Sequence, residues 1–393
     1  MHFTSLRDAD VRGKRVLLRE DLNVPMKDSA VADETRITAA LPTLRWLREH
    51  GAKTVILSHL GRPDGTPNPK YSLRPVADRL TALLGTDVRF VDDCVGGVAV
   101  AASHALPNGG FALFENVRFH REEEANDPAF ARELAKSGDL YVNDAFGTAH
   151  RAHASTAGVA ALLPPYAGFL MEAELAALAR LTDHPVHPYV CAIGGAKVAD
   201  KVGVFEHLLA KVDAFVIGGG MANTFLAAQG INVGRSLRDP DLLPAQKIIA
   251  LSLAKGVELH LPTDAVVADG FDADDTARTV PLDGVGGAMI LDIGPATARA
   301  YADVLRSAKT IVFNGPMGVY EKQPYQNGTR VVGEAIAEAT QHGATSVVGG
   351  GDAAAAAHAL GFAGAMTHVS TGGGATLEFL EGKTLPGVAA LER

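Results

Sequence analysis

Short apolar runs recur along the chain at intervals that leave room for a helix between them. Alternation of a short strand with a helix is typical of βαβ units, whose strands lie parallel in one sheet. A helical pattern around Ile37–His50, ended by Gly51, separates the first two runs. The alternation therefore predicts an α/β chain built on parallel sheets. The expected strands are Val16–Leu18, Thr54–Leu57, Phe111–Phe114, Leu140–Val142, Tyr189–Ile193, Ala214–Ile217, Met289–Ile293, Thr310–Phe313, Ser346–Val348 and Thr367–Thr371.

The strands of the first half end in polar side chains. Ligands of open parallel sheets bind outside the carboxyl ends of the strands, so these side chains are expected along one rim. Polar residues are also common in turns, and each one alone is explained that way. Together they predict a basic basin for a small molecule that carries a phosphate and a carboxylate. The side chains are Asp21, Asn23, His59, Arg62, Arg118, Asn143 and Asp144, and Arg36 of the first helix is expected to join them.

The strands of the second half end in glycine instead. Glycine lets the backbone approach a ligand closely, as the phosphates and the flat base of a nucleotide require. A single glycine after a strand is only a turn, but three GGG triplets at strand ends favour a nucleotide site. The glycine-rich ends are Gly194–Gly195, Gly218–Gly220, Gly294, Gly315–Gly318, Gly349–Gly351 and Gly372–Gly374.

The segment Gly194–Lys201 (GGAKVADK) adds two lysines to a strand–turn–helix pattern. Backbone N–H groups at such a turn attract anions, and residues four apart on a helix share one face. The spacing differs from the Walker pattern, and the alternative is a pair of solvated helix lysines. Asp352, which follows a GGG triplet, is the best candidate to hold Mg²⁺, and it also suits a helix N-cap.

A chain of 393 residues exceeds the usual size of one domain. Residues 168–181 (GFLMEAELAALARL) form a helical pattern between the two halves. We therefore expect a first domain over residues 1–167, an interdomain helix over 168–181 and a second domain over 182–374.

The net charge of −9 argues against a nucleic-acid-binding protein. Cys94 and Cys191 are the two cysteines, too few for a disulfide framework, and they favour a reducing compartment. The first residues lack an apolar signal core, and the long apolar run 353–366 is shorter than the roughly 20 residues of a spanning helix. We expect a cytoplasmic protein that does not associate with membranes.

Other chemistries find little support. His59, His150 and His153 have no metal-ligand spacing, so a histidine-bound metal is not expected. The sequence lacks the GxSxG motif that would indicate a serine hydrolase. The sequence has no GxGxxG fingerprint, which a dinucleotide-dependent dehydrogenase would require. A non-catalytic nucleotide-binding protein would not need Lys201, Arg36 and Arg118 together. A basic rim on one domain and a glycine-rich rim on the other favour a two-substrate phosphoryl-transfer enzyme.

Seven segments resemble the phosphoglycerate kinase family, in order along nearly the whole chain. They are Arg19–Pro25 (REDLNVP), Ser58–Gly65 (SHLGRPDG), Gly194–Lys201 (GGAKVADK), Gly218–Leu226 (GGGMANTFL), Asn314–Glu321 (NGPMGVYE), Gly349–Asp352 (GGGD) and Ser370–Leu377 (STGGGATL). The resemblance implies two Rossmann-like, doubly wound domains, with the tail from about 375 to 393 packed on the first. It also implies the reversible reaction of 1,3-bisphosphoglycerate and MgADP to give 3-phosphoglycerate and MgATP, and a monomer.

The resemblance also assigns site residues. Its 3-phosphoglycerate site corresponds to Asp21, Leu22, Asn23, Arg36, His59, Leu60, Gly61, Arg62, Arg118 and Arg151. Its nucleotide site corresponds to Gly195, Ala196, Lys197, Lys201, Gly219, Gly220, Leu291, Asn314, Pro316, Glu321, Gly350, Gly351, Asp352 and Ala353, with Glu321 at the ribose and Asp352 near the metal. Two positions depart from the family pattern. Ala353 replaces a hydroxyl residue, and Glu20 replaces a small or apolar residue and is expected to face away from substrate.

The chemistry requires positioning and charge neutralisation. The acceptor carboxylate, with a pKa of roughly 4, is already ionised at neutral pH, so no general base is needed. We expect Lys201 and Arg36 to cover the transferring group, with N–H groups near Gly350, Gly351, Gly372 and Gly373 sharing its charge. Domain closure, hinged at the 168–181 helix and near 370–374, is expected to unite the substrates and exclude water.

Overall fold

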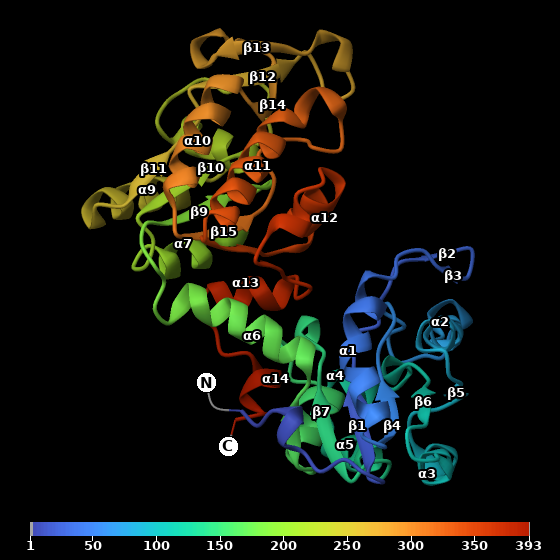
Figure 1. Ribbon diagram of the computed structural model, residues 1–393. Coiled ribbons are helices and arrows are strands. Elements are labelled where there is room, and N and C mark those ends of the chain that lie inside the picture. The colour runs from blue at the N-terminus through green and yellow to red at the C-terminus, as the bar shows by residue number, and fades with distance from the viewer. Residues whose placement is uncertain (1–2, 393) are drawn as a thin grey trace. The chain divides into compact units, whose positions relative to one another are not determined.

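Two parallel β-sheets organise the computed structural model, which describes residues 3–392 (Figure 1). One compact unit comprises the residues up to Leu175 together with those from Thr384 onward, and the other comprises Ala176–Lys383. Each unit has its own sheet with helices between successive strands. The expected α/β class with parallel sheets is confirmed.

The sheet of the first unit has, within the described residues, six strands in the order β5-β6-β4-β1-β7-β8, and all neighbours are parallel. Their bounds are β1 (Arg15–Arg19), β4 (Lys53–Leu57), β5 (Val88–Val91), β6 (Phe111–Phe114), β7 (Leu140–Asn143) and β8 (Pro165–Ala167). The central strands β1 and β4 are buried at all but their first position, because helices cover both faces of a parallel sheet. β5 and β8 were not among the predicted strands.

The helices of the first unit are α1 (Thr35–Glu49), α2 (Arg74–Leu84), α3 (Gly96–Ala105), α4 (Arg121–Glu124) and α5 (Pro128–Ala135). α1 begins two residues before the predicted helix. It buries Ile37, Leu41 and Leu44, which share one face at helical spacing. A short antiparallel hairpin of β2 (Met26–Lys27) and β3 (Ala30–Val31) precedes it.

The main sheet of the second unit has six parallel strands among the described residues, in the order β11-β10-β9-β15-β16-β17. Their bounds are β9 (Tyr189–Ile193), β10 (Ala214–Ile217), β11 (Glu258–His260), β15 (Thr310–Asn314), β16 (Thr345–Val348) and β17 (His368–Val369). β9 and β10 have the predicted bounds. β17 is shorter than the predicted 367–371 strand, because its backbone pairs with β16 at only two positions.

Met289–Ile293 is a strand, but it does not belong to the main sheet. As β14 it joins β12 (Asp264–Ala268) and β13 (Arg278–Pro281) in a separate antiparallel sheet of order β13-β12-β14. Of the predicted strands of the second half that end in glycine, this one therefore lies outside the parallel sheet. A five-residue apolar run carries no information on the direction of its neighbour, so its sequence did not reveal the difference.

The helices of the second unit are α7 (Val202–Leu208), α8 (Gly219–Ala228), α9 (Leu243–Lys255), α10 (Pro295–Ser307), α11 (Asn327–Gln341), α12 (Gly351–Ala359) and α13 (Gly374–Leu380). α6 (Phe169–Thr182) lies one residue from the bounds predicted for the interdomain helix. The division between the units falls within α6, between Leu175 and Ala176.

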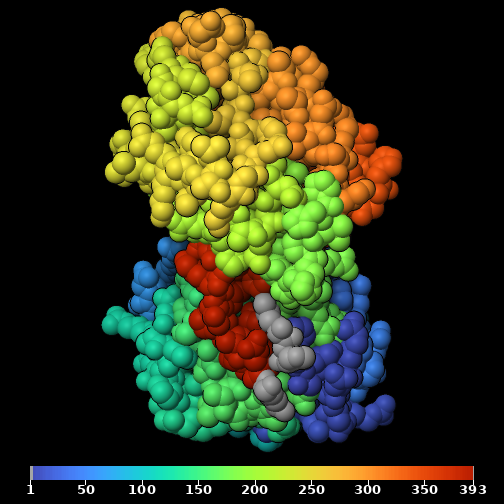
Figure 2. Space-filling model, turned by 90° about the vertical axis from the view of Figure 1, so that its left-hand side faces the viewer, coloured from blue at the N-terminus to red at the C-terminus, as the bar shows by residue number. Residues whose placement is uncertain are grey.

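The carboxyl-terminal segment returns to the first unit at Thr384, later than the expected 375. α13 stays with the second unit, where Phe379 and Leu380 are buried. From Thr384 the chain continues into α14 (Pro386–Ala389), and Gly387 N–H donates to Ala149 O at 2.8 Å. Figure 2 shows this terminal segment, in red, at the surface of the first unit.

Among residues 3–392, no helix has the length and apolar character needed to cross a bilayer.

The terminal segment gives a stability prediction. Leu391 is fully buried (0% exposed), whereas Leu253 of α9 is 83% exposed. Leu391→Ala should lower the free energy of unfolding by about 2–5 kcal/mol, because it removes buried methyl groups and leaves a cavity. Leu253→Ala should change it by less than about 0.5 kcal/mol. Urea unfolding of both variants measures this, and equal stabilities would contradict the packing described for the terminal segment.

Candidate active site

The main sheet of the second unit reverses its winding between β9 and β15. From β9 the chain moves outward through β10 to β11, and it later returns to the other side of β9 with β15, β16 and β17. The crevice at the carboxyl ends of β9 and β15 is therefore the topological switch point, where open α/β sheets bind their ligands.

Glycines allow the turns at this crevice to touch through their backbones. A Cβ atom on Gly194 would lie 2.0 Å from Pro316 O, and one on Gly219, whose φ is +64°, would lie 2.7 Å from Gly195 O. Gly195 N–H donates to Pro316 O at 3.2 Å, and Gly219 N–H donates to Met317 O at 2.8 Å. Side chains would separate these turns, so the glycine-rich ends are required by packing as well as by ligand approach.

Lys201 lies at the switch point. Its ammonium Nζ donates to Gly194 O and to Asn314 O, each at 2.7 Å, and so joins the ends of β9 and β15. Burial lowers the pKa of Lys201 to about 8, although the carboxylates of Asp352 and Asp200 favour its charged form. The site therefore holds a largely desolvated cation, which binds phosphate strongly.

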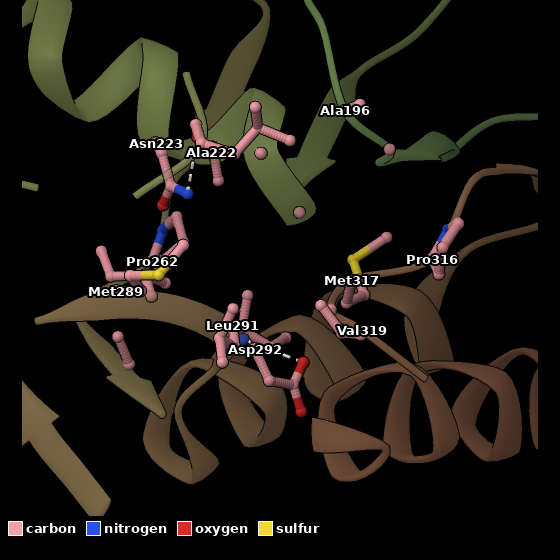
Figure 3. A pocket seen from close by; sticks show the side chains of 18 of the residues that line it. Ala196, Ala222, Asn223, Pro262, Met289, Leu291, Asp292, Pro316, Met317 and Val319 are labelled. Atoms are coloured by element: carbon pink, nitrogen blue, oxygen red, sulfur yellow. Dashed lines mark hydrogen bonds between the residues drawn. The ribbon is translucent and has the colours of Figure 1, made fainter. Parts of the chain in front are cut away.

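A cavity of about 290 Å³ opens beside this crevice (Figure 3). Figure 3 shows Ala196, Ala222 and Asn223 on one side of it and Leu291, Met317 and Val319 on the other. Its wall is mostly apolar, as a flat base requires. The predicted nucleotide residues that line it are Gly195, Ala196, Gly219, Gly220, Leu291, Pro316, Glu321 and Asp352.

The remaining predicted nucleotide residues lie outside this lining. Lys197 is exposed. Asn314 supports the next turn, since its side-chain amide donates to Gly349 O at 2.6 Å. Gly350 (φ +97°) and Gly351 begin α12, whose N-terminus favours negative charge. Gly373 also has a positive φ, of +51°.

Ala353, which replaces a hydroxyl residue of the family pattern, points away from solvent. Its side chain is 1% exposed and packs in the core of the second unit. At this position the chain therefore offers a ligand its backbone and no side-chain hydroxyl.

In the first unit, hydrogen bonds connect the loops after β1, β4 and β6. Asn23 Oδ1 accepts from Gly61 N–H at 2.8 Å, and Arg118 Nη1 donates to Gly61 O at 2.9 Å. Arg36 of α1 forms an ion pair with Asp21. Six predicted residues (Asp21, Asn23, Arg36, His59, Gly61 and Arg118) thus come from loops and a helix end that are brought together at the strand ends.

His59 is held as a neutral imidazole. Arg19 Nη2 lies 3.2 Å from His59 Nδ1, and since a guanidinium only donates, Nδ1 accepts and Nε2 carries the proton. Burial lowers the pKa of His59 well below its usual value, and the charges of Arg19, Arg118 and Arg36 lower it further. His59 is therefore a hydrogen-bond donor amid cations.

The other predicted residues of the first unit differ in exposure. Leu22 and Leu60 are buried, and Leu22 N–H is already used by Ser58 Oγ at 2.9 Å. Arg62 is exposed. Arg151 Nε donates to His150 Nε2 at 3.1 Å. Burial lowers the pKa of Arg118, and the charges of Arg19 and Arg151 lower it further.

Glu20 lies beneath this basin and away from solvent. It is buried, and burial together with repulsion from Asp144 raises its pKa well above the usual value. Burial also raises the pKa of Asp144 to about 6. The two acids therefore form a buried pair at the ends of β1 and β7 and are not at a substrate-facing surface.

Sequence reasoning missed residues that hold the site from behind. The carboxylate of Asp239 accepts from Val198 N–H at 2.8 Å and Ala199 N–H at 3.1 Å, which fixes the turn before Lys201. Nothing in the sequence indicated that Arg19, the first residue of the REDLNVP segment, contacts His59. The cavity wall also includes Asn223, Phe271, Met289 and Val319, which were not among the predicted site residues.

The comparisons with known proteins agree across the chain. The phosphoglycerate kinase family model matches residues 6–383. The chain belongs to the phosphoglycerate kinase family. It is 54% identical to the phosphoglycerate kinase of Chloroflexus aurantiacus, over all of this chain and 99% of that one, and 53% identical to that of Moorella thermoacetica, over 98% of each.

Solved structures give the same result. The structure of phosphoglycerate kinase from Coxiella burnetii matches with a TM-score of 0.91 and 44% identity over 99% of each chain. The structure of the enzyme from Pyrococcus horikoshii matches with a TM-score of 0.83 and 35% sequence identity, over 99% of this chain and 98% of that one. The chain is therefore an enzyme that transfers a phosphoryl group between a nucleotide and the carboxyl group of phosphoglycerate.

The pKa of Lys201 generates a pH prediction. In the free protein Lys201 is charged below about pH 8 and neutral above it. Because phosphate groups bind the charged form, affinity for ADP without metal should fall as pH rises above 8, by up to about tenfold per pH unit. Lys201→Arg, which stays charged, should show no such fall. Calorimetric titration on both sides of pH 8 measures this, and equal pH profiles for the two proteins would contradict it.

Proposed function

We propose that the cavity of the second unit binds ADP or ATP and that the basin of the first unit binds the phosphoglycerate. The observation that carries the first assignment is the ammonium of Lys201, which lies at the switch point beside an apolar cavity. The base fits the apolar wall, and Glu321, which also lines the cavity, fits the ribose hydroxyls. The phosphates would then extend toward Lys201 and the N-terminus of α12.

The charges of the first unit support the second assignment. Phosphoglycerate carries a phosphate and a carboxylate, and both are recognised by arginines through paired hydrogen bonds. Arg36 and Arg118 supply these cations, and Arg62 and Arg151 are proposed to join them. Neutral His59 donates from Nε2 without adding charge. Asn23 Oδ1 accepts from Gly61 N–H, and this contact would fix the loop after β1 around the hydroxyl group of phosphoglycerate.

Family members use nucleotides, generally with Mg²⁺, and the residues present fit this ion. Mg²⁺ takes one or two carboxylates together with substrate phosphates and keeps several waters. Asp352 offers such a carboxylate, since it is exposed, lines the cavity and interacts with Lys201. Bound there with the nucleotide, the ion would neutralise phosphate charge.

The residues point to transfer without a general base. The attacking carboxylate is already ionised, so the obstacle is repulsion between it and the phosphates. We assign Lys201 and Arg36 to the transferring group, and N–H groups near Gly350, Gly351 and Gly373 to its remaining oxygens. Gly372 N–H is a weaker candidate than the sequence suggested, because it donates to Ser370 Oγ at 3.1 Å.

The cellular setting is also proposed. A monomeric, cytoplasmic enzyme agrees with the reading of the sequence, and the wheat (Triticum aestivum) relative, 51% identical over 99% of this chain and 98% of that one, is named as cytosolic.

The role of Lys201 is tested by a coupled assay. MgATP and 3-phosphoglycerate are supplied, and glyceraldehyde-3-phosphate dehydrogenase consumes NADH as product forms. Lys201→Met should lower kcat on the order of 10³-fold or more, by analogy with the loss of an arginine finger. Lys211→Met is the matched control, because Lys211 also donates to a backbone carbonyl, Thr182 O at 2.9 Å, but precedes β10 at the amino end of the strand, away from the switch point. Equal losses in both variants would refute the assignment.

A second test concerns closure. In-line transfer requires the two bound substrates to meet, so we expect the radius of gyration from small-angle scattering to fall when both are bound. Either substrate alone should give a smaller change. An unchanged radius with both substrates would contradict domain closure and leave the binding assignments intact.

A further inference from the structure

Two neighbouring strands of the first unit place three metal-binding side chains together. Asp93 and Cys94 follow β5, and His120 follows β6 and the short 3₁₀ helix Val117–Phe119. β5 and β6 are adjacent and parallel, so both segments leave the same edge of the sheet. None of the three residues is used by the proposed phosphoglycerate or nucleotide site.

The ligand atoms of these residues are close to one another. His120 Nε2 lies 2.8 Å from Asp93 Oδ1, and these atoms and Cys94 Sγ all lie within 4.8 Å of one another. Cys94 is only 1% exposed, and within residues 3–392 its thiol has no hydrogen bond to another residue. A buried thiol without a partner therefore faces a histidine and a carboxylate.

The kinds of ligand atom select the ion. A thiolate, an imidazole and a carboxylate are the groups that bind Zn²⁺, whereas Mg²⁺ and Ca²⁺ prefer oxygen alone. At the usual zinc–ligand distances the edges of the tetrahedron are about 3.3–3.6 Å. Entry of the ion would replace the hydrogen bond between His120 and Asp93 and separate these two side chains slightly. Any contact between ligand atoms that is longer than such an edge, up to 4.8 Å, would shorten.

The surroundings orient the ligands and leave access. Asp93 Oδ1 accepts from Cys94 N–H at 2.7 Å and from Val95 N–H at 3.4 Å, which orients the carboxylate. Asp93 and His120 line a cavity of about 390 Å³, and their side chains are 43% and 28% exposed. The cavity provides an entry path and room for a water as fourth ligand.

We propose that Asp93, Cys94 and His120 form a binding site for a divalent transition metal ion, with Zn²⁺ the best fit. Binding would release the thiol proton to solvent and connect the segment after β5 to the segment after β6. The site differs from that of the Mg²⁺ proposed with the nucleotide, because that ion belongs with Asp352 in the other unit.

The chain contains a matched control for this cluster. His187 Nδ1 lies 2.7 Å from Asp213 Oδ2, so this pair repeats the histidine–carboxylate contact without a cysteine. Cys191 is the second cysteine and is fully buried within β9. His187→Asn and Cys191→Ala therefore change the same residue types elsewhere.

The test uses the full-length protein, freed of metal with a chelator and titrated with Co²⁺ and then with Zn²⁺ without nucleotide. Co²⁺ should give a sulfur-to-cobalt charge-transfer band in the near ultraviolet at one equivalent, and Zn²⁺ should displace it. Cys94→Ala should abolish the band, and Cys191→Ala should keep it. Circular dichroism checks that each variant folds.

His120→Asn keeps the thiol and provides a second, independent variant. It should weaken Zn²⁺ binding by more than the roughly 10–100-fold that outer-shell changes cost, measured by calorimetry. His187→Asn should bind Zn²⁺ as the unchanged protein does. Absence of the band, its persistence in Cys94→Ala, or equal Zn²⁺ affinity in His120→Asn and His187→Asn would each overturn the proposal.

Discussion

One partly buried ammonium joins two neighbouring strands, β9 and β15, at the centre of the main sheet of the second unit. Lys201 Nζ donates to two backbone carbonyls at the carboxyl ends of β9 and β15, Gly194 O and Asn314 O, at 2.7 Å each. Burying a cation is unfavourable, which is why its pKa falls to about 8, and the two carbonyls offset part of that cost. The glycine turns allow this approach, and the mostly apolar cavity opens beside it. A bound polyphosphate would add negative charge to that of Asp352 and Asp200 and stabilise the ammonium further.

The first unit uses a buried cation in a comparable way. Arg19, at the end of β1, is fully buried and donates to Ser155 Oγ at 2.8 Å, to Glu20 O and to His59 Nδ1. Ser155 is anchored in turn by Glu123, at 2.6 Å. Arg19 is thus a positioning residue, which fixes the tautomer of His59. In both units, a cation holds the loops at the strand ends together.

Local patterns explain what the sequence predicted correctly and what it missed. Runs such as Tyr189–Ile193 are buried on both faces, and the glycines after them lie in close backbone contact. The sequence therefore predicted these strands and the glycine-rich turns at their ends. The partner of a strand is not encoded locally, and Met289–Ile293 therefore joined a different sheet than expected. Asp239 and the Asp93–Cys94–His120 cluster depend on contacts between residues far apart in the chain, which no motif spacing records.

The proposed nucleotide site depends on Lys201, whose pKa burial lowers in the free protein and bound phosphate would raise. Nuclear magnetic resonance of the protein with ¹³C-labelled lysine, assigned with Lys201→Arg, reports the titration of this one side chain. We expect a midpoint near pH 8 in the free protein and a clearly higher midpoint with ADP bound, because phosphate stabilises the charged form. A midpoint near the ordinary lysine value of about 10.4 that ADP leaves unchanged would contradict it.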